Sequence, residues 1–176
     1  YTTASHDVIT TFSEKLSDGV DLNFENISTK MVYVGTGQNA VLSEDGKTIT
    51  YIIDDNVSLE YQLTYAGYKE DIVVKQYTGK THFDFLFYTA GMSLEENGES
   101  YSLVDSEGHV KAFLGDVIAF TADERNNTFG EIKANAVIPN QLYKVTISVD
   151  PEWLKDENTA YPIRIDPTLE VNYDNN

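Results

Sequence analysis

The chain has 176 residues, of which 41% are hydrophobic. This size and composition suit one folded domain with a real core and exclude a disordered chain. Acidic residues number 29 against 12 lysines and arginines, giving a formal net charge of -17. Such a surface repels phosphate backbones and anionic lipid, so the composition argues against nucleic-acid binding. There is no cysteine, which excludes disulfides, thiolate zinc sites and cysteine catalysis. No apolar run approaches the roughly 18 residues of a membrane span, so we expect no membrane insertion.

Alternation of apolar and polar side chains with a period of two dominates the chain and predicts β-strands. Residues 19–24 and 31–34 are the weaker candidates, within a less certain N-terminal region that covers residues 1–46. The clearer strand candidates are residues 47–53, 57–65, 71–76, 82–89, 101–105, 110–114, 117–121, 129–137, 141–149 and 161–165.

These patterns predict an all-β protein, a two-sheet antiparallel β-sandwich of roughly ten to twelve short strands. Helix signals are poor: only residues 151–155 resemble a helical turn, with Asp150 as N-cap and Pro151 at the first position. We expect a single domain over residues 1–168. Its last strand is expected over residues 161–165, with Asp166-Pro167-Thr168 as the boundary and residues 169–176 as the start of a linker.

Two segments carry a resemblance to a known family. The first reads YIIDDNVSLEY over residues 51–61 and GYKEDIVVK over residues 67–75; the second joins Trp153-Leu154 to YPIRIDPT over residues 161–168. Together they resemble the β-rich domain that precedes DNRLRE-type modules in secreted and wall-associated bacterial proteins of the Rhs/YD-repeat kind. That domain ends on tyrosine-proline-valine-x-isoleucine-aspartate-proline-threonine. Here Glu60 follows Leu59, where the family often has aspartate before leucine.

The resemblance implies an exported bacterial protein, extracellular or at the cell surface, whose partners include neighbouring domains of the same longer chain. We therefore expect a non-catalytic structural or spacer module and not an enzyme. No GxSxG elbow is present, and the three histidines, His6, His82 and His109, share no metal-binding spacing. The residues expected to matter for structure are Lys69, Glu70, Trp153, Tyr161 and Asp166.

The alternative function is a carbohydrate-binding module with a polysaccharide partner. Sugar-binding sandwiches present aromatic rings as flat platforms, and Tyr65, Tyr68 and Tyr77 cluster near a turn as the best exposed candidates. Other tyrosines lie at core spacing, where the ring packs and the hydroxyl reaches the rim. The single tryptophan, Trp153, is expected to be buried and to close the end of the sandwich.

Lys69 and Glu70 follow a turn at Gly67-Tyr68 and allow three interpretations. Both charges can be solvated at the start of an exposed strand, where the pair is worth under about 1 kcal/mol. One of them can instead be buried and hold the sheets in register. The third alternative is an isopeptide cross-link from Lys69 to an asparagine or acid, which would lower the intact mass by about 17 or 18 Da.

Acidic loops at residues 54–56, 105–107 and 123–126 are candidates for calcium, which prefers several oxygen ligands. None has the acid spacing of an EF-hand loop. Charged loops between strands are more often ordinary turns, so we assign no metal ligand and no cofactor.

Overall fold

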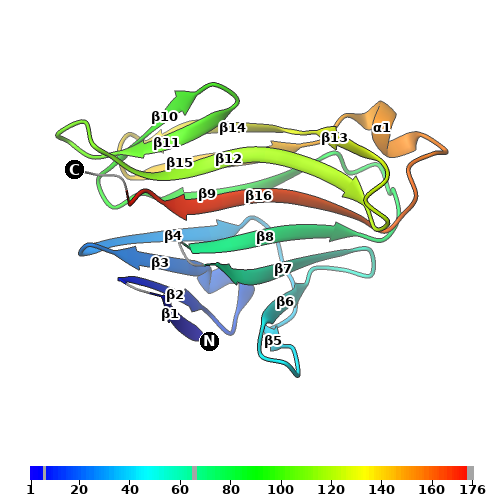
Figure 1. Cartoon of the computed structure of the whole chain (residues 1–176), viewed down its shortest axis with the longest axis horizontal. Helices are drawn as coiled ribbons and strands as arrows, with labels where there is room; N and C mark the ends of the chain where they lie inside the picture. Colours follow the sequence, from blue (N-terminus) through cyan, green and yellow to red (C-terminus); the bar gives the residue numbers. More distant parts are fainter. Residues whose placement is uncertain (6, 65–66, 174–176) are drawn as a thin grey trace.

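The strands form two antiparallel sheets that pack face to face, which confirms the expected all-β sandwich (Figure 1). The computed structural model describes residues 1–5, 7–64 and 67–173. The seven-stranded sheet has the order β1 (Thr2–Ser5), β2 (Val8–Phe12), β3 (Val20–Phe24), β4 (Ile27–Tyr33), β9 (His82–Tyr88), β15 (Leu142–Ser148) and β14 (Glu131–Ile138). The nine-stranded sheet has the order β10 (Ser93–Asn97), β11 (Ser100–Val104), β12 (Val110–Thr121), β16 (Ile163–Val171), β8 (Gly67–Val74), β7 (Val57–Thr64), β6 (Thr48–Ile52) and β5 (Val41–Leu42), with β13 (Asn127–Phe129) paired to β12.

Within the described residues the chain makes sixteen strands, more than the ten to twelve expected. The added strands are short or polar, such as β5 with two residues and β10 with the sequence SLEEN. The expected strands 110–114 and 117–121 are one long strand, β12, interrupted by a bulge between Gly115 and Ile118. Short strands leave too few alternations for a period of two to be seen in sequence.

The core lies between the sheets, and along most of the longer strands every second side chain points into it. An aromatic cluster joins the two layers: the Phe12 ring from β2 lies 5.4 Å from the Tyr61 ring and 6.2 Å from the Tyr68 ring. Tyr61 also contacts Tyr51 at 5.9 Å between ring centroids. Tilted and edge-on pairs of this kind each add about 0.5–1.5 kcal/mol beyond area burial, so the cluster helps to hold the layers together.

Helix α1 (Pro151–Lys155) closes one end of the sandwich, as Figure 1 shows. The Asp150 side chain accepts a hydrogen bond from the Glu152 backbone N–H at 3.0 Å, which confirms the expected N-cap. A 3₁₀ turn covers Leu16–Asp18. None of the helices formed by the described residues has the length and apolar composition that crossing a membrane requires.

Strand β16 lies in the middle of the nine-stranded sheet, between β12 and β8. It runs through Asp166-Pro167 to Val171, and Leu169 and Val171 are buried, so the strand continues three residues past the expected boundary at 168. Proline in a central strand removes a ladder hydrogen bond. On the β12 side, the bulge lies opposite Pro167, so Pro167 has no ladder partner there. On the β8 side, Pro167 faces Glu70, because Ile165 pairs with Ile72 and Thr168 pairs with Lys69.

The β12 bulge brings Gly115 unusually close to the neighbouring strand β11. A Cβ atom added at Gly115 would lie 2.0 Å from the Ser100 Cβ and 2.9 Å from the Ser100 Cα. We therefore expect Gly115→Ala to lower the free energy of unfolding by about 1–3 kcal/mol, as overpacking does elsewhere. Urea denaturation of the two proteins measures the difference.

The double variant Gly115→Ala/Ser100→Gly tests the cause, because it removes the Ser100 Cβ at 2.0 Å and leaves only the longer, 2.9 Å contact with the Ser100 Cα. It should recover part of the loss relative to Gly115→Ala, with Ser100→Gly alone as the reference. A loss that is the same with and without Ser100→Gly would show that the contact is not the reason.

Candidate functional site

Charged side chains gather on three adjacent strands of the nine-stranded sheet, β7, β8 and β16. Neighbouring residues of a strand point to opposite faces. Strand β8 therefore places Lys69 and Asp71 on the outer face of the sheet and Glu70 between the two sheets. The site thus has an outer part and an inner part, separated by the thickness of one strand.

The outer part is an ion network, which we define as Glu60, Lys69, Asp71, Arg164 and Asp166. Arg164 Nη1 lies 2.6 Å from Glu60 Oε2 and 3.0 Å from Asp71 Oδ2. Lys69 Nζ lies 3.0 Å from Asp166 Oδ2 and 3.8 Å from Asp71 Oδ1. Three strands are thereby linked through two cations and three carboxylates.

Negative charge exceeds positive charge in this ion network, and part of it is buried. The Asp71 side chain is only 7% exposed. Asp71 Oδ1 and Asp166 Oδ1 are buried without a hydrogen-bond partner. Burial raises the pKa of Asp166, although its hydrogen bond with Lys69 acts in the opposite direction. Each cation already contacts two carboxylates, so the network is suited to fixing strand register more than to capturing an anion.

The inner part is Glu70, which is 5% exposed. The Tyr61 hydroxyl hydrogen-bonds its carboxyl group, whereas Glu70 Oε2 is buried without a partner. Burial raises the pKa of Glu70 from its usual value of 4.5 to about 7, against the Tyr61 hydrogen bond and with help from the negative charges of Asp71 and Asp166. Glu70 therefore holds its proton far more tightly than an exposed glutamate.

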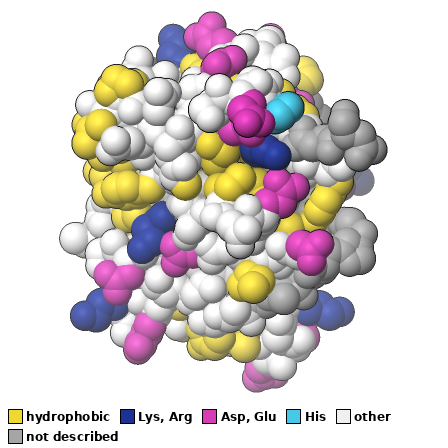
Figure 2. All heavy atoms as spheres, turned by 90° about the vertical axis from the view of Figure 1, so that its left-hand side faces the viewer, with side chains coloured by type: hydrophobic (Ala, Val, Ile, Leu, Met, Phe, Trp, Pro, Cys, Tyr) yellow, Lys and Arg dark blue, Asp and Glu magenta, His cyan; other side chains and the backbone are white. Residues whose placement is uncertain are grey.

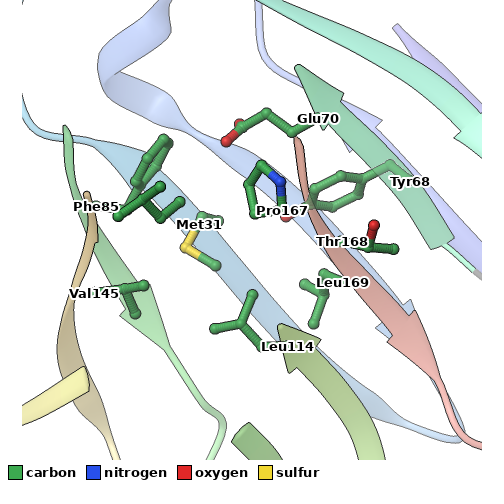
Figure 3. Close-up of a pocket in the computed structure, with 10 residues that line it drawn as sticks. Met31, Tyr68, Glu70, Phe85, Leu114, Val145, Pro167, Thr168 and Leu169 are labelled. Carbon is green, nitrogen blue, oxygen red and sulfur yellow. The ribbon is translucent and has the colours of Figure 1, made fainter. Parts of the chain in front are cut away.

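Glu70 borders a cavity in the core with about 20 Å³ of room for the centre of a water molecule, enough for one water. Figure 3 shows the Glu70 carboxyl beside Pro167, with Met31 and Phe85 across the space. Both sheets supply the mostly apolar lining: Met31, Tyr68, Phe85, Leu114, Val145, Ile147, Pro167, Thr168 and Leu169. A water there would find few polar partners besides Glu70.

These positions decide between two of the interpretations of Lys69-Glu70. The expectation that both charges are solvated is wrong, because Glu70 is buried and Lys69 is held by Asp166 and Asp71. Sequence reasoning missed Glu60, Asp71 and Arg164. The signal that was available is the spacing of Tyr68, Glu70, Ile72 and Val74, which puts Glu70 on the apolar face of its strand.

The expected tyrosine platform is not formed by the residues named for it. Tyr68 is 3% exposed and packs in the aromatic cluster, so it cannot stack on a ligand at the surface. Tyr77 is half-buried against the core, and Tyr65 lies outside the described residues. The expectation failed because Tyr68 shares the inward face with Glu70 and Ile72.

Trp153 and Tyr161 close the α1 end of the sandwich through hydrogen bonds as well as packing. Trp153 is half-buried against the core, and its Nε1 donates to Asn126 Oδ1 at 3.1 Å. The Tyr161 hydroxyl donates to the Leu154 carbonyl at 2.8 Å. The Trp153 ring is less buried than expected, and its indole N–H has a hydrogen-bond acceptor in Asn126.

The three acidic loops use their leading aspartates in turns. Asp54 Oδ1 accepts the backbone N–H groups of Asn56 and Val57, and Asp123 Oδ1 accepts that of Arg125. Asp105 Oδ1 likewise accepts two N–H groups, which hold the pKa of Asp105 below its usual value. This is the turn chemistry in which aspartate is favoured.

One of these loops also brings three potential metal ligands together. Ligand atoms of Asp105, Glu107 and His109 lie within 4.8 Å of one another and could hold a divalent cation. Lys111 Nζ lies 4.0 Å from Asp105 Oδ2 and 3.1 Å from Glu25 Oε2, so a lysine already competes for the same carboxylate. Figure 2 shows this end of the molecule, where acidic side chains lie among apolar and uncharged ones.

Comparison with known proteins gives relatives of one kind. The chain is 25% identical to the tRNA nuclease WapA of Bacillus subtilis (strain 168) over 180 residues. It is equally similar to the tRNA3(Ser)-specific nuclease WapA of Bacillus spizizenii and 24% identical to the tRNA(Glu)-specific nuclease WapA of Bacillus subtilis subsp. natto. Each match covers 91% of this chain but only 8% of the relative. No family model and no solved structure matches the chain.

These relatives correct four expectations. The predicted non-catalytic structural module and its carbohydrate-binding alternative are contradicted, because the relatives are named as nucleases. The expectations of no enzyme and of no nucleic-acid partner are contradicted for the same reason. The charge argument failed because a net charge of -17 describes 176 residues, whereas the relatives are far longer than the part matched here.

Arg164 is the cation that contacts both Glu60 and Asp71, so its removal tests the ion network. We expect Arg164→Ala to lower the free energy of unfolding by about 2–3 kcal/mol, less than for a fully buried pair because the Arg164 side chain is 34% exposed. Chemical denaturation at neutral pH measures this loss.

Lys155→Ala is the matched control, because Lys155 and Glu152 form an exposed pair 3.9 Å apart. It should cost under about 0.5 kcal/mol. Equal losses for the two variants would contradict the view that the ion network contributes to stability.

Proposed function

We propose that the chain is one β-sandwich unit of a bacterial, WapA-like tRNA nuclease, and that tRNA cleavage by the intact protein is the activity it serves. The observation that carries this proposal is the match to proteins named as tRNA nucleases over 91% of the chain. That span takes in nearly all of the sandwich, so the similarity concerns a folded unit and not a short motif.

The proposal includes the setting of the protein. The relatives come from Bacillus, which supports a bacterial source. The segments GYKEDIVVK over residues 67–75 and YPIRIDPT over residues 161–168 support an exported, wall-associated or secreted protein in which a β module of the DNRLRE kind follows this unit. The chain spans about 8% of the length of the relatives it matches, so most of the protein's contacts with tRNA would be made elsewhere in it.

The experiment is tRNA cleavage by the full-length protein that contains this chain. The purified protein is incubated with total tRNA, and the fragments are separated on denaturing gels. We expect discrete tRNA fragments, with ribosomal RNA and a DNA duplex left uncut as specificity controls. Intact tRNA after incubation with folded, full-length protein would contradict the proposal.

The isolated chain, residues 1–176, forms a second arm of the same assay. Cleavage by the isolated chain would place the nuclease groups within it, and Glu60→Gln, Asp71→Asn and Arg164→Ala would then be compared. Cleavage by the full-length protein alone would assign the reacting groups to other parts of the protein.

A further inference from the structure

The buried carboxyl of Glu70 has no structural role that would explain its unpaired oxygen. Glu70 is 5% exposed, and its Oε2 lies without a hydrogen-bond partner at the edge of an apolar cavity. An ionised carboxylate in such a place is costly unless a cation compensates it. The surroundings of Glu70 therefore decide which charge state the folded chain accepts.

Strands from both sheets pack against Glu70, and none of them brings a cation to it within the described residues. The seven-stranded sheet presents only apolar side chains to the cavity: Met31, Phe85, Val145 and Ile147. The nine-stranded sheet, to which Glu70 belongs, contributes the hydroxyl of Tyr61, the ring of Tyr68 and the apolar side chains of Leu114, Pro167 and Leu169.

The charged groups that act on Glu70 are Asp71 and Asp166, on the outer face of the sheet, and both are negative. The nearest cations of the ion network, Lys69 and Arg164, lie on that outer face and are taken up by those carboxylates and Glu60. The neutral carboxyl is therefore favoured inside the closed sandwich, and the charged carboxylate is disfavoured.

We propose that Glu70 is a proton-binding switch built into the interface between the two sheets. With its proton, the sandwich closes over the carboxyl group. Without the proton, the sheets part locally at the cavity, so that water reaches Glu70 Oε2. The cavity beside Oε2 already has room for one water, which makes it the place where such an opening begins. This inference is independent of the proposed nuclease function.

The direction of the pH effect follows from the proton affinities of the two states. The closed state has a pKa of about 7 for Glu70, whereas an open, hydrated state has the usual value of 4.5. The closed state is thus most favoured below about pH 4.5 and loses that advantage as the pH rises toward 7. Between these values the ratio of open to closed molecules rises by up to about tenfold per pH unit, and it levels off above pH 7.

Amide hydrogen exchange between pH 5 and 8 tests the switch. The protection of the β8 and β16 amides, corrected for the intrinsic pH dependence of exchange, should fall by up to about tenfold per pH unit up to pH 7 in the wild type. Glu70→Gln keeps the size of the side chain and cannot ionise, so its protection should be flat over this range. Glu170→Gln makes the same change at an exposed position of β16, outside the ion network, and should keep the wild-type profile.

A second measurement decides the matter even if Glu70→Gln does not fold. The carboxyl ¹³C resonance of Glu70 in the wild-type chain should titrate near pH 7, well above the usual glutamate value of 4.5. A Glu70 midpoint near 4.5 would overturn the proposal. Identical exchange profiles for wild type and Glu70→Gln would overturn it as well.

Discussion

The nine-stranded sheet depends on the pairing of β16 with β8 on one side and with β12 on the other. Strands β5 to β8 come before residue 75, and strands β10 to β13 lie between residues 93 and 129. Among the strands that the structure describes, only β16 joins these two groups within one sheet. Its inward residues Ile163, Ile165 and Leu169 are buried in the core, and its outward Arg164 and Asp166 enter the ion network.

Charge is therefore placed on both faces of the same central strands, with opposite consequences. On the outer face, Arg164 and Lys69 compensate carboxylates from neighbouring strands, which favours one register of β7, β8 and β16. On the inner face, Glu70 has a tyrosine hydroxyl and no cation. A one-residue slip of β8 would exchange these faces, putting Lys69 into the apolar core and Glu70 among acids. The network thus protects the sandwich against mispairing.

Much of the fold could be read from local sequence. The alternation in residues 57–65 and 82–89 predicted β7 and β9, and Asp150-Pro151 predicted α1, because these signals depend only on neighbouring residues. The pairing of β8 with β16 joins residues that are far apart in the chain, from Ile163 with Val74 to Glu170 with Gly67, and no local pattern contains it. The ion network was missed for that reason: Glu60 and Asp71 pair across the β7–β8 hairpin, but Arg164 reaches them only through the pairing of β16 with β8. The burial of Glu70 was visible in principle, because it alternates with Tyr68 and Ile72.

The central position of the last strand also governs when the sheet can form. Strands β5 to β8 present an open edge along β8 until residues 163–171 are available to pair with it. Contacts of such long sequence separation carry a high loop-closure cost and make folding slow. In a chain that emerges from a ribosome or a secretion channel, the nine-stranded sheet would thus stay incomplete until residues 163–171 have emerged. Its exposed edge would need protection from pairing with other chains until the last strand arrives.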